Sequence, residues 1–406
     1  MVAAARSVFT LTDDHVQRLR LNHPVVRIAL CAVGFRLASA ALAFVANVVF
    51  PDASNQGFSM FGTPSPFWDA FTRHDSGWYY QIARNGFHYT PGGRDTIAFF
   101  PVYPLLMRYV GRAFGRSPSD LYLGGIVVSW TAFIAAMIVL YFLARLDLPR
   151  RLAERAVLFT AIFPFAFFFG VVYTESTYLM FTVLTFYFFR TRRWIAGGIC
   201  GAFATASRVN GILMFPALAW IAWSTAEKTS RDRMMAAIGL ALVTCGVGAY
   251  SLFVYQLTAI PGGSHNPFEW VAAIERWGYY PGGSPGTAPL QLLRHLVTHP
   301  YAYLAGDRQA PYDTLNGLAG IAFLVSVPFV WRRFGAPYGL FVLANLWLPL
   351  SSGVFEGVGR YCAVMFPCFI WLATLRSRAV TAGVCVTFAM LYTLCLALFT
   401  NVHPLF

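Results

Sequence analysis

Long apolar runs separated by short polar turns make up most of the chain. A helix that spans a membrane needs about 20 predominantly apolar residues, and such segments recur along the sequence; they predict about eleven spanning helices. We therefore expect residues 1–406 to form a single all-α, polytopic integral membrane domain. The predicted spans lie near residues 28–50, 121–143, 156–172, 177–189, 194–207, 209–224, 234–257, 314–331, 336–351, 359–375 and 379–400.

Two long segments, residues 51–120 and 258–313, interrupt these runs. Arginine clusters such as those at 145–155 and 190–193 fall in alternate connections, and the positive-inside rule places them and the N-terminus in the cytoplasm. Both long segments then form outer, non-cytoplasmic loops with interfacial helices. The second is rich in Gly, Pro and aromatic residues, which suits either a mobile lid or a platform for the acceptor.

The aromatic residues of the second loop have two interpretations. We favour a place at the substrate pocket for residues 265–270, which include His265. Trp277, Tyr279 and Tyr280 are expected in an aromatic belt at the membrane surface.

Composition excludes an ordinary soluble protein, because 57% of the residues are hydrophobic and only 12% are charged. The net charge of +13 does not indicate nucleic-acid binding, since the positive-inside rule accounts for the arginines. All basic residues but Lys228 are arginine, which together with many alanines hints at a GC-rich genome and a bacterial cell membrane.

Two predicted hairpins, within residues 156–189 and 194–224, are short. Each leg has roughly 15–17 residues, or about 25 Å of helix, so both tips should lie below the outer surface. The tips carry Glu175 and the segment Arg208-Val209-Asn210-Gly211. Polar, irregular backbone at this depth is tolerated where it lines a cavity, so we expect an outward-facing polar cavity. The alternative is a purely structural ion pair between Glu175 and Arg208.

The first outer loop contains HDSGWYYQIARNGF at residues 74–87 and AFFPVYPLL at residues 98–106. Trp78 and Ile82 share one face of a helix, so the stretch after Asp75 is predicted to be an amphipathic interfacial helix. Asp75 would then be either its N-cap or a functional carboxylate. Residues 98–110 are too short to span and are broken by prolines, which favours an interfacial or re-entrant segment.

These motifs resemble the first luminal loop of the GPI mannosyltransferase 2 (PIG-V) family and its bacterial relatives, within the GT-C class of polyprenyl-phosphate-dependent glycosyltransferases. The resemblance continues in order through Phe163–Ser176, Ser207–Gly211 and Gly359–Pro367, and so covers most of the chain. It implies a GT-C-type fold. GPI synthesis is eukaryotic whereas this composition is bacterial in character, so the acceptor is not carried over.

The resemblance implies transfer of mannose from polyprenyl-phosphate-mannose to a lipid-linked or glycan acceptor on the non-cytoplasmic face. The family's catalytic carboxylate maps to Asp75. Such a donor already has a good leaving group, so the enzyme needs a base for the acceptor hydroxyl and cations for the phosphate. Attack opposite the phosphate inverts the anomeric centre and makes an α-mannoside from a β-linked donor.

Arg208 and Arg360 are the first candidates for binding the donor phosphate, because guanidinium groups bind phosphate oxygens bidentately. An ion pair with Glu356, four residues earlier, is the alternative for Arg360. The second choices are Arg73 and His74. The candidate substrate-binding residues are Glu175, Asn210, Tyr173, Trp78 and His265.

No cofactor and no metal are expected. A divalent metal held by Asp75 with His74, His88 or Glu175 is an alternative that no ligand spacing supports. The expected partners are the lipid-phosphate donor, the acceptor and the bilayer. Two other functions stay open: a GT-C enzyme with another lipid-phosphate sugar, or a lipid transporter, which would place its charges at mid-membrane and would not need large outer loops.

Overall fold

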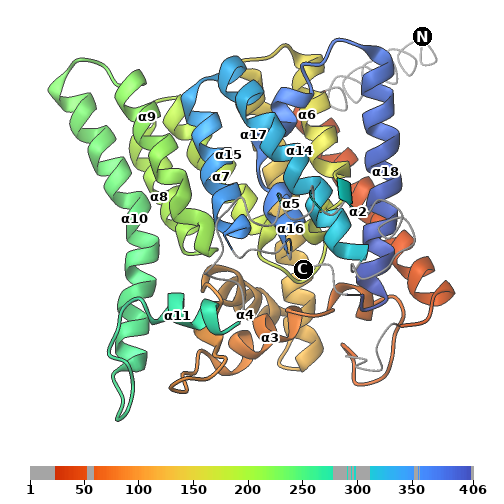
Figure 1. The fold of residues 1–406 in the computed structure, drawn as a ribbon. Coiled ribbons are helices and arrows are strands. Elements are labelled where there is room, and N and C mark those ends of the chain that lie inside the picture. The colour runs from red at the N-terminus through yellow and green to blue at the C-terminus, as the bar shows by residue number, and fades with distance from the viewer. Residues whose placement is uncertain are drawn as a thin grey trace, which may run out of the picture.

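The computed structural model describes residues 23–52, 59–277, 311–351, 355 and 357–403, with isolated positions between 290 and 298. Within these ranges every regular element is helical, and five helices are long and apolar enough to cross a membrane. The expected all-α membrane architecture is confirmed (Figure 1). The five long helices are α2 (Pro24–Val49), α5 (Pro118–Arg145), α10 (Ser230–Thr258), α14 (Pro311–Phe334) and α18 (Arg378–Thr400).

Shorter helices fill the bundle between the long ones, and the total of eleven spans stays a prediction. Their ends follow polar turns or prolines in the sequence. They are α6 (Arg150–Ile162), α7 (Glu175–Arg190), α8 (Trp194–Thr205), α9 (Phe215–Thr225), α15 (Ala336–Leu350), α16 (Val358–Ala363) and α17 (Phe366–Leu372).

Three predicted spans are wrong as continuous α-helices. The segment 156–172 is helical only to the end of α6, because Pro164 disfavours helical backbone before it and supplies no N–H; the 3-10 turn η3 (Ala166–Phe169) follows. The segment 209–224 starts as the 3-10 helix η4 (Val209–Met214) before α9. The segment 359–375 divides into α16 and α17, with Pro367 in the first turn of α17.

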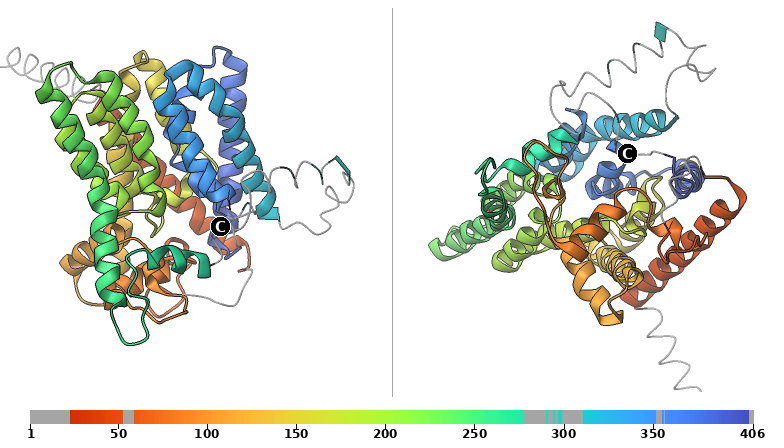
Figure 2. Two further views of the ribbon diagram at one scale, coloured as in Figure 1. Left: turned by 60° about the vertical axis from the view of Figure 1, so that its left-hand side comes forward. Right: turned by 90° about the horizontal axis from the view of Figure 1, so that it is seen from below.

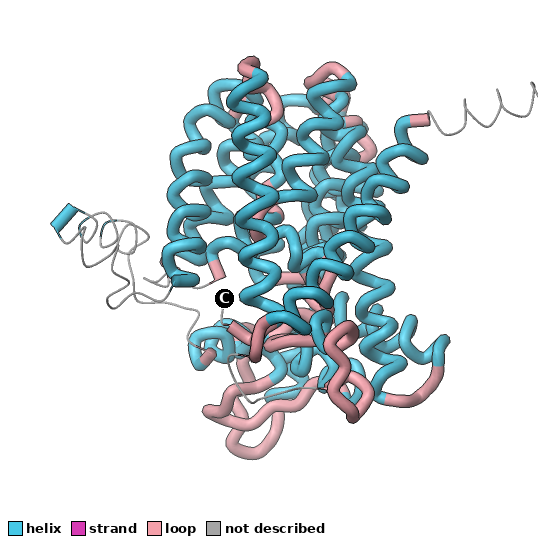
Figure 3. The backbone as a smooth tube through the Cα atoms, turned by 90° about the vertical axis from the view of Figure 1, so that its right-hand side faces the viewer, coloured by secondary structure: helices cyan, strands magenta, loops and turns pink. Residues whose placement is uncertain are grey.

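The first outer loop folds into a platform at one end of the bundle, which we call the α3–α4 end (Figures 1 and 2). Most of the longer loops gather there (Figure 3). The two predicted interfacial segments are confirmed as helices, and α4 is too short to span a membrane. The platform consists of η1 (Asp69–Phe71), α3 (Ser76–Asn85), η2 (Thr96–Ala98) and α4 (Val102–Phe114), and α11 (Glu269–Arg276) of the second outer loop joins it.

Two glycines let the platform pack directly on the bundle. A Cβ at Gly124 of α5 would lie 2.4 Å from the backbone nitrogen of Gly111 in α4, so the two helices touch backbone to backbone. Tyr103 of α4 also donates a hydrogen bond to the Gly125 carbonyl at 3.0 Å. The residues after Asp75 are thereby held against a spanning helix.

Candidate active site

Asp75 lies directly before α3, but its side chain does not cap that helix. Its Oδ2 accepts a hydrogen bond from Nη1 of Arg360 at 3.0 Å, and its backbone N–H donates to the hydroxyl of Tyr173 at 3.1 Å. The side chain keeps 18% of its surface exposed. Asp75 therefore occupies the N-cap position without capping the helix through its side chain, and its carboxylate is paired with Arg360 instead.

Glu175 connects the two predicted arginines. Its side chain is completely buried, and Oε1 accepts from Nη1 of Arg208 at 2.6 Å and from Nε of Arg360 at 2.8 Å. The predicted Glu175–Arg208 ion pair thus exists, but it continues through Arg360 to Asp75. Two carboxylates balance two guanidinium groups, which meets the requirement that buried charges be paired.

Aromatic rings cover the flat faces of both guanidinium groups. Arg208 lies 4.8 Å from the ring centre of Tyr361, and Arg360 lies 4.8 Å from that of Tyr173 and 5.0 Å from that of Phe168. Cation–π contacts of this kind are favourable in partly desolvated places. With ion pairs at their edges and rings on their faces, the arginines have fixed orientations.

Close backbone contacts bring the two hairpin tips together. The hydroxyl of Thr174 donates to the carbonyl of Ser207 at 3.0 Å, which joins the segments before α7 and after α8. A Cβ at Gly211 would lie 2.6 Å from the Ala204 carbonyl oxygen, so only glycine fits this turn. Gly211 therefore lets the tip that carries Arg208 fold closely against the end of α8.

A second glycine positions Arg360. A Cβ at Gly359 would lie 2.4 Å from the ring of Phe165, and the Gly359 N–H donates to Asn316 Oδ1 at 2.8 Å. The start of α16 is therefore packed against the buried turn that follows α6. Glu356, the predicted alternative partner of Arg360, lies outside the described residues.

The charged residues Asp75, Arg208 and Arg360 line one pocket between the bundle and the platform, whereas Glu175 lies buried behind it. Aromatic and aliphatic side chains make up much of the rest of its lining. The tips thus meet at a cavity, as expected, but its lining is mixed and not mainly polar. The other lining residues are Tyr79, Ala98, Phe99, Phe100, Thr174, Ser207, Val209, Ile274, Trp277, Gly357 and Tyr361.

The remaining predicted substrate-binding residues do not line this pocket. Tyr173 is fully buried beneath it, and Trp78 lies behind its aromatic wall with its ring 6.0 Å from that of Phe99. Asn210 is buried and donates to Asn345 Oδ1 at 2.7 Å. His265 is exposed in the loop after α10. Roles in substrate contact for these four residues have no support from their positions.

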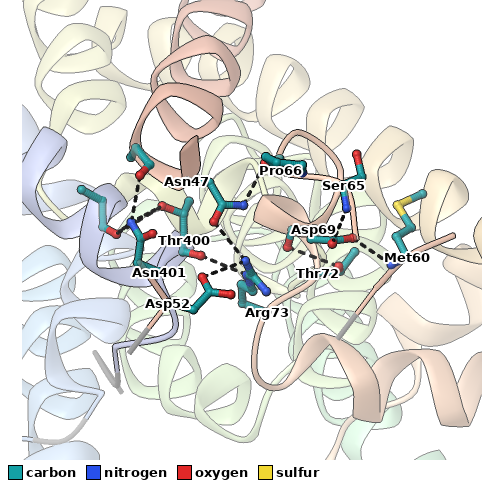
Figure 4. A network of polar contacts seen from close by, with 12 residues as sticks. Asn47, Asp52, Met60, Ser65, Pro66, Asp69, Thr72, Arg73, Thr400 and Asn401 are labelled. Atoms are coloured by element: carbon teal, nitrogen blue, oxygen red, sulfur yellow. Dashed lines mark hydrogen bonds and ion pairs between the residues drawn. The ribbon is translucent and has the colours of Figure 1, made fainter. Parts of the chain in front are cut away.

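Arg73 belongs to a separate network (Figure 4). Its Nε donates to the Thr400 carbonyl at 3.0 Å, and its Nη2 donates to Asn47 Oδ1 at 3.1 Å and Asp52 Oδ1 at 3.3 Å. These partners come from the ends of α18 and α2. Arg73 therefore ties the first outer loop to two spanning helices and does not line the pocket.

His74 is packed against Phe399, with the ring centres 5.3 Å apart. Burial, and then the nearby charges of Arg73 and Arg360, lower the pKa of His74 to about 4. The imidazole is neutral at physiological pH, so it supplies no positive charge for a phosphate. No three His, Cys, Asp or Glu side chains within the described ranges are placed to hold a metal ion.

Several pocket residues were missed from the sequence. Tyr361 and Ser207 each adjoin a predicted arginine, so their position in the motifs was a usable signal. The sequence predicts Trp277 in an aromatic belt at the membrane surface. It lines the pocket instead, because α11 folds back onto η2. Tyr279 and Tyr280 lie outside the described residues. Tyr79 gave no signal, since it looked like part of an interfacial helix.

Comparisons with known proteins agree with a membrane glycosyltransferase in part of the chain. Residues 100–249, less than half of it, match the family model of dolichyl-phosphate-mannose-protein mannosyltransferase. This range includes Glu175 and Arg208 but neither Asp75 nor Arg360. A search of curated proteins found no match.

Among solved structures, the chain is similar to the oligosaccharyltransferase of Archaeoglobus fulgidus. The complex with Zn and sulfate has a TM-score of 0.45 and 15% identity, covering 92% of this chain and 53% of that one. The apo form has a TM-score of 0.46 and 14% identity, with coverages of 92% and 56%. The chain therefore spans about half the length of these proteins.

Proposed function

We propose that the protein is a GT-C membrane glycosyltransferase that moves mannose from polyprenyl-phosphate-mannose to a lipid-linked or glycan acceptor. One observation carries the proposal: a partly exposed carboxylate and two oriented arginines line a single pocket at one end of a membrane bundle. The family match over residues 100–249 and the ordered resemblance to GPI mannosyltransferase 2 support the same chemistry.

Asp75 is the general base. It takes the proton from the acceptor hydroxyl while that oxygen attacks the anomeric carbon, and the lipid phosphate departs from the opposite face. The phosphate is a good leaving group, so no acid is required. One displacement inverts the anomeric centre, and a β-linked donor gives an α-mannoside.

Arg360 and Arg208 hold the donor phosphate and stabilise its charge as it leaves. Glu175 orients both guanidinium groups through Oε1, from a position behind the pocket. The phosphate competes with Asp75 for Arg360, because both are anions within reach of the same guanidinium edge. Donor binding thereby weakens the Asp75–Arg360 ion pair and leaves the carboxylate oxygen available to accept the hydrogen bond of the acceptor hydroxyl.

The aromatic wall gives the sugar a surface to pack on. Phe99, Trp277 and Tyr361 line the same pocket as the charged residues. Sugar rings present C–H groups that pack well on such faces, so this wall would set the position of the mannose relative to Asp75.

The orientation in the membrane follows from the arginines. The turns that join α5 to α6, α7 to α8 and α9 to α10 are rich in basic residues and lie at the end opposite the platform (Figure 1). On the positive-inside rule, we propose that this end faces the cytoplasm and that the pocket lies on the non-cytoplasmic face of a bacterial cell membrane. The proposal includes no metal or cofactor.

The test is a donor panel with the purified protein and a lipid extract as the source of acceptors. Labelled mannosyl polyprenyl phosphate, glucosyl polyprenyl phosphate and a nucleotide-linked mannose are offered separately. We expect transfer from the mannosyl lipid, with an α-linked product, and none from the nucleotide sugar. Preference for the glucosyl lipid would show that the transferred sugar is glucose and not mannose. Failure of both lipid donors would overturn the proposal.

A further inference from the structure

A second cluster of charges lies at the α3–α4 end, outside the proposed active site. Arg84 of α3, Arg112 of α4 and Arg116, just after α4, line one cavity of about 500 Å³ together with Ala83, Gly115 and Leu121. None of these residues lines the pocket of Asp75 and Arg360. The positive-inside rule does not explain three arginines at this end, so they require another reason.

The arginines of this cluster have few protein partners. Arg84 donates to the hydroxyl of Tyr80 at 2.6 Å. Arg112 and Arg116 have no ion pair or side-chain hydrogen bond with any residue that the structure describes. The nearby carboxylate of Asp120 accepts from the backbone N–H and the hydroxyl of Ser117, both at 2.7 Å. Within the described part of the chain, no carboxylate pairs with Arg112 or Arg116, and the cavity carries an excess of positive charge.

The cavity lies where a bilayer surface would meet the protein. Leu121 lines it and also begins the apolar part of α5, one of the membrane-crossing helices. The exposed side of α4 presents Leu105, Tyr109 and Phe114 beside Arg112. Apolar and aromatic side chains next to arginines are typical of helices that lie in the headgroup region.

An apolar cavity adjoins the charged one. Ile82 of α3 lines a cavity of about 740 Å³ with residues of α4, α8 and α10, whereas Ala83 lines the arginine cavity. Arg108 lies between them, since its side chain lines the apolar cavity and donates to the carbonyls of Ile82 at 2.8 Å and Ala83 at 2.5 Å. A charged headgroup site and a site for hydrocarbon are therefore neighbours.

We propose that this site binds an anionic phospholipid of the outer leaflet. Arg84, Arg112 and Arg116 hold its phosphate, and its acyl chains follow the exposed side of α4 toward the apolar cavity. Guanidinium groups match the geometry of a phosphodiester, and basic pockets between membrane helices bind lipid headgroups. The bound lipid neutralises the cluster and fixes the platform from which Asp75 projects. This site is separate from the donor site, so its existence does not depend on the proposed function.

The test measures retained lipid by native mass spectrometry of the purified full-length protein. The probe is phosphatidylglycerol, with phosphatidylcholine as the zwitterionic comparison. The variant Arg112→Gln/Arg116→Gln removes the two arginines that have no ion pair or side-chain hydrogen bond with the described residues, so we expect it to fold. The matched control is Arg332→Gln/Arg333→Gln, which removes two exposed arginines from the far end of α14.

We expect the first phosphatidylglycerol to bind about fivefold more weakly for each arginine removed from the cluster, with the control within twofold of the wild type. Equal retention by the cluster variant, or equal loss in the control, would overturn the site. Displacement by millimolar inorganic phosphate alone, or preference for a polyprenyl phosphate over phosphatidylglycerol, would overturn the assignment to a phospholipid.

Discussion

Two arginines lie beside Asp75, and their surroundings differ. Arg73, two residues earlier in the chain, donates hydrogen bonds to Thr400, Asn47 and Asp52 and does not line the pocket (Figure 4). Arg360, far away in sequence, contacts Asp75 directly and lines the pocket. Proximity in sequence to Asp75 therefore does not predict which arginine contacts its carboxylate, whereas the shared pocket does.

Arg36 extends this comparison into the bundle. It is 1% exposed, donates to the Ala166 carbonyl and to the hydroxyl of Tyr392, and packs 4.3 Å from the ring centre of Phe133. No carboxylate pairs with it within the described part of the chain. A buried arginine in a membrane protein can thus be a structural element, and the carboxylates around Arg360 distinguish the candidate site.

The largest effect is expected at Asp75. Asp75→Asn removes the proposed base but leaves Arg360 paired with Glu175, so transfer should fall about a thousandfold while the protein still folds. The rate of mannose transfer from the labelled lipid donor measures this. Glu227→Gln, a carboxylate-to-amide change near the opposite end, is the control and should keep wild-type activity; a similar loss there would assign the effect to general damage.

Arg360→Ala should lower transfer by about 10²–10³-fold, because it removes a proposed stabiliser of the leaving phosphate. Arg360→Lys keeps the charge but not the fork geometry and should recover only part of the activity. Initial rates and donor affinity are measured together. Arg333→Ala is the matched control, and a loss of activity without any loss of donor affinity would remove the phosphate role.

Arg73→Gln tests the other side of the comparison. It breaks the network that joins the first outer loop to α2 and α18, which should lower the free energy of unfolding by about 1–3 kcal/mol. Thermal unfolding in detergent measures the loss. Transfer per folded molecule should stay within about threefold of the wild type, and a drop as large as that of Arg360→Ala would bring Arg73 back into the site.

The smallest effect concerns His74. Its folded-state pKa of about 4 lies below its ordinary value of 6.5, so the unfolded chain binds the proton first as the pH falls. The wild type therefore loses stability below pH 6.5, by about 2 kcal/mol at pH 5. His74→Asn, which tolerates the positive φ of 55° at this residue, should show a shallower decline in melting temperature between pH 7 and pH 5. If the melting temperatures of the wild type and of His74→Asn fell equally between pH 7 and pH 5, the lowered pKa of His74 would be contradicted.

The long helices were predictable because their apolar runs are uninterrupted, as in α5 and α10. The break after α6 was not recognised, since the residues on both sides of Pro164 are aromatic or aliphatic and hydropathy alone does not register a turn among them. Proline in such a run was the available signal. The same reasoning applies to the division between α16 and α17.

Glu175 and Arg208 were predictable as neighbours because opposite charges isolated at two short, buried hairpin tips need a partner, and each is the other's nearest candidate. The contact of Arg360 with Asp75 joins residues 285 positions apart, and no local pattern encodes it. Asn345, the partner of Asn210, was missed for the same reason. Patterns in sequence found the charged residues, and only the fold showed which of them meet.

The most direct test of the account is an experimental structure of the Asp75→Asn variant with uncleaved mannosyl polyprenyl phosphate. We predict that the donor phosphate lies within hydrogen-bonding distance of the Arg360 and Arg208 guanidinium groups, with the anomeric carbon facing the residue 75 amide. A phosphate bound elsewhere, for example between Arg84, Arg112 and Arg116, would contradict the assignment of the active site.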